Sequence, residues 1–409
     1  MSLNTRYSIA CCYNTTSQKA DMLSPIMLPQ HKSATQGTMH LLSTAGLQKM
    51  LQPCLLLLFM VCSQLIQAQT TTGDTLHYAD EKHFKNIRQL TFGGDNAEAY
   101  WSFDNSRIIF QRTNPKEGVM CDRMFVGRIP ATDKDSFSFY EVSNGRGRTT
   151  CGYFMPNGKE VLYASTYLGG DSCPPVPDRT KLGNRYVWPI YESFDIFRAG
   201  TDGKIRERVT TTPGYDAEAT LSRDGKKMIF TSMRDGDLDL YVMDMATKKI
   251  IRVTKDLGYD GGAWFSPDGT KIVWRASRPK TEAEIKDYKD LLAQGLVAPT
   301  QMEVFVANAD GSNAKQITHL GNANWAPNFT PDGKRIIFCS NHEYKRGFPF
   351  NMYLINMDGT GLEKISRDKG FDAFPMFSSD GKKIMFSSNR SNGGTRDTNL
   401  FMADWVDNP

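Results

Sequence analysis

Acidic or amide side chains recur at one position of a repeated pattern in this chain of 409 residues. They stand six residues before five of six similar turns, and Thr149 takes that position before the other. Clustered carboxylate and carbonyl oxygens are the ligands that hard cations prefer. Brought to one opening, these side chains would bind a divalent cation such as calcium, or an ammonium group. The residues of this candidate binding site are Asn96, Asp216, Asp260, Asn324 and Asp372, with Glu98 and Glu218 two residues further along. The alternative is structural, because Asp and Asn also bond neighbouring backbone amides and hold turns.

A second recurring position holds an arginine just after the second apolar run of several repeats. These arginines are Arg112, Arg234, Arg278 and Arg390. One interpretation is an ion pair with a turn carboxylate of the neighbouring repeat. The other is a ring that binds a carboxylate or phosphate, since the planar guanidinium suits such groups. His342 lies in a loop at the same end of the repeats and belongs to the same candidate group.

The known catalytic motifs are missing from the sequence. It contains no G-x-S-x-G elbow, no H-E-x-x-H, no C-x-x-C and no phosphate-binding loop. Paired carboxylates alone suffice for some glycosidic chemistry. A propeller hydrolase or lyase acting on a peptide or polysaccharide therefore stays open, and its residues would be Asp216, Glu218, Asp260, Arg234 and His342. We expect a protein that binds a partner without catalysis and needs no cofactor.

The elements that position these residues form a repeat, which is the strongest signal in the chain. Each copy joins two apolar runs by an Asp-Gly or Asn-Gly type of turn, and this pattern predicts a hairpin whose central residues both have positive φ. The copies are WSFDNSRIIF (101–110), FMPNGKEVLY (154–163), LSRDGKKMIF (221–230), FSPDGTKIVW (265–274), FTPDGKRIIF (329–338) and FSSDGKKIMF (377–386).

A second hairpin follows each of these, which makes four strands per unit. A single four-stranded unit cannot bury both faces of its sheet. Six units in a row bury these faces against one another when they close into a ring. The last unit lacks its outer strand, and NIRQLT (86–91) matches the missing pattern. We therefore predict an all-β, six-bladed β-propeller over residues 86–409 with four-stranded antiparallel blades. An N-terminal strand closes it, and its polar rings surround a central channel.

Several of these units resemble a known repeat. FSPDGTKIVWRASR, FSSDGKKIMFSSNR and LSRDGKKMIFTSMRDGDLDLYVMD are similar to the WD40-like repeat of TolB-like periplasmic propellers, which also builds the propeller of prolyl-oligopeptidase-type enzymes. The resemblance covers about residues 86–409 and implies the propeller fold. It implies little about function, because the motif is one that folds blades. The chain has no room for the amino-terminal domain of the Tol-associated protein, so a stand-alone propeller is expected.

The long segments of the chain fall on one face of this propeller, which we call the long-loop face. They are 166–193, 279–301, 341–350 and 389–398. The opposite face carries the Asp-Gly turns and is called the turn face. Because binding residues concentrate on loops over a rigid scaffold, we expect a protein, peptide or glycan partner on the long-loop face.

Residues 281–295 predict a helix in blade 4 with Thr281 and Glu284 as a capping box. Cys173 is expected to form a disulfide with Cys121 or Cys151.

The amino-terminal region is predicted to be a leader that is removed. Residues 54–62 are an uncharged apolar run, too short to span a bilayer, and a small-residue cleavage site ends at Ala68. We assign 1–68 to an extension with a signal peptide and 69–85 to a short linker.

The whole chain carries a net charge of +4, and residues 1–68 hold four basic residues and one acidic residue. The mature chain is thus nearly neutral, which argues against a nucleic-acid partner. We expect a periplasmic or secreted monomer without a membrane span, whose partner lies in the cell envelope.

Overall fold

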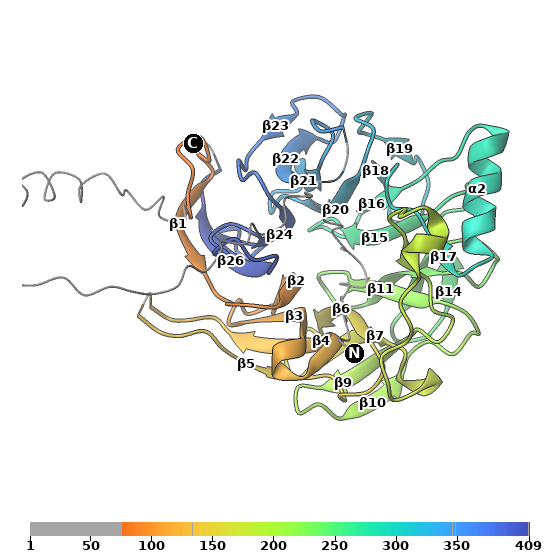
Figure 1. The fold of residues 1–409 in the computed structure, drawn as a ribbon, viewed down its shortest axis with the longest axis horizontal. Coiled ribbons are helices and arrows are strands. Elements are labelled where there is room, and N and C mark those ends of the chain that lie inside the picture. The colour runs from red at the N-terminus through yellow and green to blue at the C-terminus, as the bar shows by residue number, and fades with distance from the viewer. Residues whose placement is uncertain (1–75, 133, 346, 348, 408) are drawn as a thin grey trace, which may run out of the picture. The chain divides into compact units, whose positions relative to one another are not determined.

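The computed structural model describes residues 76–132, 134–345, 347, 349–407 and 409. These residues form six four-stranded antiparallel sheets around a common centre (Figure 1), which confirms the predicted six-bladed propeller. The predicted extension and signal peptide (1–68, with its apolar run 54–62) lie outside the described residues, as does the first part of the expected linker.

The first three blades follow each other along the chain. Blade 1 contains β2 (Asp95–Trp101), β3 (Arg107–Asn114), β4 (Val119–Arg128) and β5 (Ser138–Glu141). Blade 2 contains β6 (Thr149–Phe154), β7 (Glu160–Ser165), β9 (Asp195–Gly200) and β10 (Ile205–Arg208). Blade 3 contains β11 (Asp216–Leu221), β12 (Lys227–Ser232), β13 (Asp239–Asp244) and β14 (Ile250–Arg252). In each blade the first strand is innermost and the last is outermost.

Blades 4 to 6 complete the ring. Blade 4 contains β15 (Asp260–Phe265), β16 (Lys271–Ala276), β18 (Glu303–Asn308) and β19 (Lys315–Gln316). Blade 5 contains β20 (Asn324–Phe329), β21 (Arg335–Ser340), β22 (Asn351–Asn356) and β23 (Glu363–Lys364). Blade 6 contains β24 (Asp372–Phe377), β25 (Lys383–Ser388), β26 (Asn399–Trp405) and β1 (Phe84–Gln89).

The amino-terminal strand closes the ring as predicted. β1 pairs antiparallel with β26, and Phe84 lies opposite Trp405. This pairing supplies the outer strand of blade 6, so β26 has a partner on both sides. The strand begins two residues earlier than predicted, and the segment before it is not a free linker. Glu81 in that segment has no exposed surface and bonds Arg390 of blade 6.

The hairpin turns differ in detail from the prediction. In blade 3 the amide of Gly225 donates to the carbonyl of Ser222 at 2.8 Å, and Gly225 has a φ of 70°. Asp224 is not among the residues with positive φ; its carboxylate accepts from Ser222 Oγ at 2.6 Å and from the amide of Lys226 at 3.1 Å. The turn is therefore a four-residue loop built on a type I turn, in which only the glycine adopts the left-handed conformation.

The core lies between neighbouring blades. Ile109 and Val126 of blade 1, for example, pack with Phe154 and Tyr163 of blade 2, and all four are fully buried. Alternate strand residues face each neighbour, which explains the apolar runs of the repeat.

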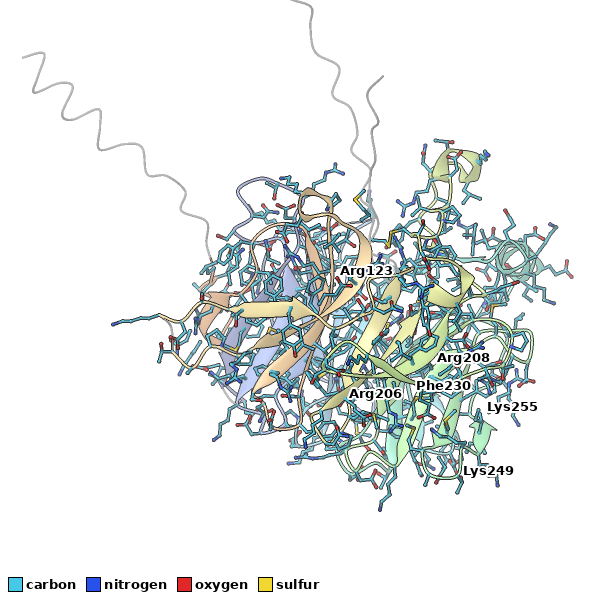
Figure 2. The ribbon with its side chains drawn as sticks, turned by 90° about the horizontal axis from the view of Figure 1, so that it is seen from below. Arg123, Arg206, Arg208, Phe230, Lys249 and Lys255 are labelled. Atoms are coloured by element: carbon cyan, nitrogen blue, oxygen red, sulfur yellow. A yellow bond between two sulfur atoms is a disulfide. The ribbon has the colours of Figure 1, made fainter. Side chains whose placement is uncertain are left out.

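The long segments carry short elements of their own. These are the 3₁₀ turns η2 (Pro115–Glu117), η3 (Tyr167–Gly169) and η4 (Arg179–Leu182), the strands β8 (Trp188–Pro189) and β17 (Leu296–Val297), and the helix α2 (Glu282–Leu292). Thr281 and Glu284 form the predicted capping box of α2. The helix buries Tyr288 and Leu291, and the partly buried Leu292 packs against the hydrophobic core. Figure 2 shows the propeller from the side, with Arg123 towards the long-loop face and Lys249 towards the turn face.

Candidate functional site

A β-bulge interrupts the innermost strand of every blade at the same position. In blade 3 the register with β12 shifts between Ala217 and Thr220, and the residue inside the shift, Glu218, has a φ of 59°. A bulge redirects the side chain that it carries. The six bulge residues have φ values of 50–61° and are Glu98, Cys151, Glu218, Gly262, Ala326 and Phe374.

These six residues line a small cavity on the propeller axis, which we call the central chamber. Its volume is about 30 Å³, and its other lining residues include Tyr100, Trp264 and Arg275. A cavity of that size holds one or two water molecules. Of the candidate binding residues from the sequence, the structure brings Glu98 and Glu218 to this chamber.

Glu218 and Arg275 form a hydrogen-bonded pair at one side of the chamber. Arg275 Nη2 lies 3.3 Å from Glu218 Oε1 and donates to Tyr259 Oη at 2.9 Å, and Tyr259 donates to Glu218 at 2.6 Å. Gly262 makes room for this arrangement, because a Cβ there would lie 2.1 Å from Arg275 Nη1. The sequence analysis did not single out Arg275. An arginine inside the apolar run KIVWRA was the available signal.

Glu98 is the second carboxylate of the chamber and has a different environment. Its side chain is buried, and Tyr100 Oη donates to Glu98 Oε2 at 3.2 Å. Burial, with a smaller contribution from the charge of Glu218, raises the pKa of Glu98 to about 7, against a hydrogen bond from Cys151 and the charge of Arg275.

A wider funnel leads to the chamber from the turn face. It has a volume of about 170 Å³ and shares Trp264, Asn328 and Met376 with the chamber. Its wall is largely aromatic and proline-rich, with Ser379 and Arg223 among the residues of the turns. The aromatic and proline residues of the wall are Trp101, Phe103, Tyr153, Trp264, Phe265, Pro267, Phe329, Pro331 and Phe377.

On the long-loop face, an aromatic cluster lies behind the chamber. Trp188 is buried and stacks on the guanidinium of Arg275, whose centre is 5.1 Å from the ring. Trp188 also contacts Trp325, with ring centroids 5.3 Å apart, and Trp325 stacks on Phe350 at 4.6 Å. The chamber is thus backed by packed side chains on the face where we expected the binding site.

The long segments of blades 2 and 4 hold this aromatic cluster together. β8 pairs antiparallel with β17, so that Trp188 lies opposite Val297. Arg185 binds Asp287 of α2 through two hydrogen bonds of 2.5 Å. α2 lies at the edge of the ring beside β17 (Figure 1). The two segments form one cover and not two separate loops.

The ring of Asp and Asn residues turns away from the channel and into the blades. All five of these side chains are buried, and none of them lines the chamber. Asn96 donates to the carbonyls of Gly93 and Thr398, and Asn324 donates to those of Met302 and Gly321. These are the contacts of the structural alternative, in which the residue holds the connection between two blades.

The arginines bind this ring, and the expected partner was wrong. Arg234 Nη2 lies 3.0 Å from Asp216, Arg278 Nη2 lies 2.6 Å from Asp260, and Arg390 Nη2 lies 2.9 Å from Asp372. Arg112 Nη1 donates to Asn96 at 2.6 Å. Each partner lies at the start of the innermost strand of the same blade: the three aspartates are the first residues of their strands, and Asn96 is the second residue of β2. The turn carboxylates of the neighbouring blade lie on the opposite face, because the arginine follows strand two at the long-loop end.

Burial dominates the electrostatics of these pairs. It raises the pKa of Asp260 to about 7 although Arg278 and Trp274 bind the carboxylate. Burial also raises the pKa values of Asp216 and Asp372, against the charges of Arg234 and Arg390. His342 has no carboxylate partner of this kind. Its Nδ1 lies 3.0 Å from Ser340 Oγ, and burial lowers its pKa.

The five residues proposed for catalysis do not gather at one site, although Arg234 binds Asp216. Of Asp216, Glu218, Asp260, Arg234 and His342, only Glu218 lines the central chamber. In the part of the chain that the structure describes, no group of three or more His, Cys, Asp or Glu residues is arranged to hold a metal ion. A search of the same residues finds no helix whose length and hydropathy would carry it through a bilayer.

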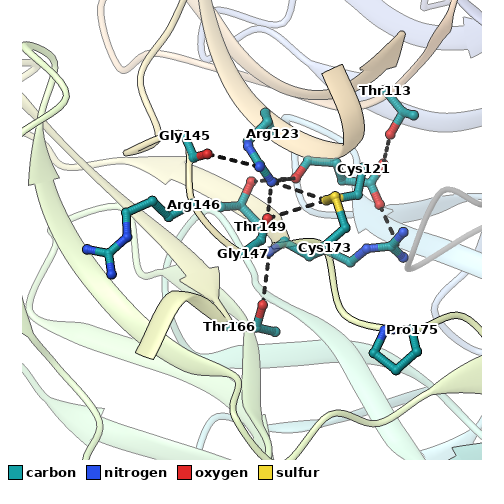
Figure 3. The surroundings of a disulfide bond; sticks show 12 residues. Thr113, Cys121, Arg123, Gly145, Arg146, Gly147, Thr149, Thr166, Cys173 and Pro175 are labelled. Atoms are coloured by element: carbon teal, nitrogen blue, oxygen red, sulfur yellow. Dashed lines mark hydrogen bonds and ion pairs between the residues drawn. A yellow bond between two sulfur atoms is a disulfide. The ribbon is translucent and has the colours of Figure 1, made fainter. Parts of the chain in front are cut away.

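A disulfide anchors the blade 2 segment on the long-loop face. Cys173 is bonded to Cys121 of β4, over a sequence separation of 52 residues (Figure 3). Arg123 lies beside it and donates to the carbonyl of Gly145 at 3.0 Å. Cys151, the other partner considered for Cys173, is not part of a disulfide, and its thiol is buried in the bulge ring. Met120, Ser172 and Cys173 line a hollow of about 450 Å³ next to this bond.

Comparisons with known proteins agree with this architecture. The family model of the TolB beta propeller domain matches residues 297–396. A protein assigned as TolB from Agrobacterium tumefaciens is 18% identical, with a TM-score of 0.51, and the match covers 78% of this chain and 97% of that one. TolB from Acinetobacter baumannii is 18% identical, with a TM-score of 0.44, over 76% of this chain and 64% of that one.

A third solved structure is an enzyme. An oligogalacturonate lyase in complex with manganese is 14% identical, with a TM-score of 0.45, over 81% of this chain and 96% of that one. At such low sequence identities, the similarity shows the fold alone. With the family match and six closed blades, the chain is a TolB-like six-bladed β-propeller.

Proposed function

We propose that this propeller is an exported binding protein that holds a segment of a protein or peptide partner in the funnel of its turn face. The observation that carries the proposal is the funnel of about 170 Å³ with its aromatic and proline wall. Concave sites with apolar walls and few polar groups are the usual form of binding sites. Export rests on the predicted signal peptide, and it places the partner in the cell envelope.

The proposal moves the binding site from the long-loop face to the turn face. The long segments of blades 2 and 4 are bound to each other and cover the aromatic cluster. The long-loop face has hollows of about 450 and 480 Å³, but these lie beside the disulfide and beside α2. The funnel is lined by residues of all six blades and opens to the central chamber. The wall presents rings and prolines together with six polar side chains, and the proposal commits to a peptide that packs on the rings. The polar residues are Ser102, Arg223, Ser266, Asn328, Ser378 and Ser379.

A catalytic role has one observation in its favour, the pKa of Glu98 near 7, which suits a general acid or base. The chamber of about 30 Å³ argues against it, because no sugar ring or peptide bond fits beside that carboxylate. Turnover of any member of a peptide and oligosaccharide panel, abolished by Glu98→Gln, would establish the enzyme instead.

The binding proposal is tested by blocking each face in turn. Ser379→Trp places a large ring at the mouth of the funnel, where Ser379 is exposed. Ser172→Trp is the matched control, since Ser172 is exposed on the long-loop face. The full chain and both variants serve as bait in an envelope extract. Capture of the same partner by the wild type and Ser172→Trp, with loss in Ser379→Trp, supports the funnel. The reverse pattern places the site on the long-loop face.

A further inference from the structure

We infer that the funnel recognises a carboxylate of its peptide partner, which binds Arg223 while a neighbouring apolar side chain packs on the aromatic wall. The carboxylate is either the carboxyl terminus of the partner or the side chain of an aspartate or glutamate. The inference rests on the proposed function, because it assigns the chemistry of the segment that the funnel holds.

Five of the six polar side chains in the funnel wall are bonded within the protein. Three serines each donate to the aspartate of their own hairpin turn at 2.7 Å or less, and these are Ser102, Ser266 and Ser378. Ser379 donates to Asn105 at 2.9 Å, and Asn328 donates to the sulfur of Met376 at 3.0 Å. The sixth is Arg223, which has no hydrogen bond or ion pair with any residue that the structure describes. Its guanidinium is therefore the polar group of the wall that remains to bind a partner.

The surroundings of Arg223 favour an anion. Among the described residues, no acidic side chain lines the funnel. Asp224, the next residue, accepts from Ser222 Oγ at 2.6 Å and from the amide of Lys226 at 3.1 Å, and Lys226 Nζ lies 3.6 Å from it. Burial raises the pKa of Tyr153 to about 12 against the charge of Arg223, so that charge acts on the wall itself. A carboxylate in the funnel would meet a cation that is not already neutralised by an ion pair.

The position of Arg223 determines where the carboxylate lies. Arg223 is exposed in the turn after β11 of blade 3, at the rim of the funnel. Ser379 stands in the corresponding turn of blade 6, which is on the opposite side of the six-bladed ring. Glu98 and Glu218 line the central chamber and not the funnel. A bound peptide would place its carboxylate at the blade 3 rim, away from the carboxylates of the chamber.

A carboxylate next to an apolar side chain fits both features of the funnel. The planar guanidinium of an arginine offers two parallel N–H donors to the two oxygens of a carboxylate. Beside it, the rings of Tyr153 and Trp264 meet edge to face, with centroids 5.4 Å apart, and both line the funnel. Such rings bury the apolar surface of a neighbouring side chain. The arginine thus supplies specificity for charge, and the rings supply apolar contact.

The test measures the binding of short peptides to the full chain by isothermal titration calorimetry at neutral pH and low salt. Acetyl-Gly-Gly-Phe with a free carboxyl terminus is compared with its amide, and acetyl-Asp-Phe-Gly-amide is compared with acetyl-Asn-Phe-Gly-amide. We expect at least one acid to bind about tenfold more tightly than its neutral counterpart, because hydrogen bonds to charged groups are the stronger ones. The pair with the larger preference identifies the source of the carboxylate. The preference should shrink at high salt, because the arginine is exposed.

Arg223→Gln removes the charge of an exposed side chain without a partner, so the protein should fold and the preference for the acid should disappear. Lys226→Gln is the matched control, because Lys226 is an exposed cation of the same turn outside the funnel wall, and it should keep the preference. Equal affinity for the acids and their neutral counterparts, or binding of none of them, would overturn the inference. An equal loss in both variants would also overturn it, since the preference would then come from the general charge of the turn.

Capture from the envelope extract separates this inference from the proposed function. Arg223→Gln should lose the partner, as Ser379→Trp does. If Ser379→Trp loses the partner while Arg223→Gln retains it, the inference is wrong and the funnel remains the site. If Ser379→Trp leaves capture intact, the proposed function itself is wrong.

Discussion

Arg390 and Glu81 are 309 positions apart in the sequence, yet their side chains form an ion pair of 2.8 Å in which neither side chain has exposed surface. Arg390 also binds Asp372, the first residue of blade 6, at 2.9 Å. Glu81 accepts a further hydrogen bond from the amide of Arg367 at 2.8 Å. The segment before β1 is therefore part of the ring closure, in addition to the strand itself.

Removing Arg390 should destabilise the propeller strongly. Arg390→Met leaves the buried carboxylates of Glu81 and Asp372 without their cation, and the loss of one member of a buried ion pair costs about 3–5 kcal/mol. Glu81→Gln should cost less, because Asp372 still binds the arginine. Urea denaturation gives the free energy of unfolding of each variant.

The control is Asp290→Asn in the exposed pair of Lys286 and Asp290 on α2. Exposed pairs of this kind contribute about 0–1 kcal/mol. A loss in Arg390→Met no larger than that of Asp290→Asn would show that the segment before β1 does not support the closure.

The disulfide should stabilise the blade 2 segment through the unfolded chain. Its separation of 52 residues corresponds to about 4 kcal/mol in the chain-entropy model, and measured effects are typically about 2–4 kcal/mol. The double variant Cys121→Ala, Cys173→Ala should lose that amount in urea denaturation. A reductant should lower the stability of the wild type to the same level and leave the variant unchanged. A reductant effect of equal size in both proteins would contradict the assignment.

Glu98→Gln should stabilise the protein by an amount that grows between about pH 4.5 and pH 7 and is complete above pH 7. Burial raises the pKa of Glu98 from 4.5 to about 7 in the folded protein, so the wild type loses stability over that range, in which the unfolded chain is ionised and the buried group still holds its proton. The glutamine does not ionise. We expect the variant to be about 2–3 kcal/mol more stable at pH 8 and to lose this advantage near pH 4.5. A difference that is the same at both pH values would show that Glu98 is not the titrating group; Glu282→Gln serves as the control.

The propeller could be predicted because its signals are local. Turns of the type in LSRDGKKMIF and FSPDGTKIVW depend on a few neighbouring residues, and the apolar alternation of a strand is visible over five or six residues. The same holds for the capping box of Thr281 and Glu284. The closing strand at 86–91 was visible because it repeats a pattern seen in the other blades.

The site could be predicted only in part, because the bulges leave no mark on the sequence. In a sequence, a left-handed backbone conformation is usually predicted from a glycine, and among the bulge residues only Gly262 is one. The same conformation is adopted by Glu98, Glu218, Ala326 and Phe374. In a regular strand without a bulge, the side chains of residues two positions apart point to the same face of the sheet. The two polar rings were therefore assigned to one site, whereas one faces the chamber and the other binds arginines inside the blades.

Trp188→Ala should destabilise the protein by about 3–5 kcal/mol, because the large ring is buried between Trp325 and the guanidinium of Arg275 and its removal leaves a cavity. Arg185→Ala removes only the partly exposed ion pair with Asp287 and should cost less than about 1 kcal/mol. Both variants weaken the contact between the segments of blades 2 and 4. Trp188→Ala removes the packing behind the chamber, and Arg185→Ala removes the ion pair with α2, so comparing them separates the two contributions. Thermal and urea unfolding measure the two effects. A small loss in Trp188→Ala would mean that the aromatic cluster does not hold the cover, and the long-loop face would then be open to a partner, as the sequence analysis first expected.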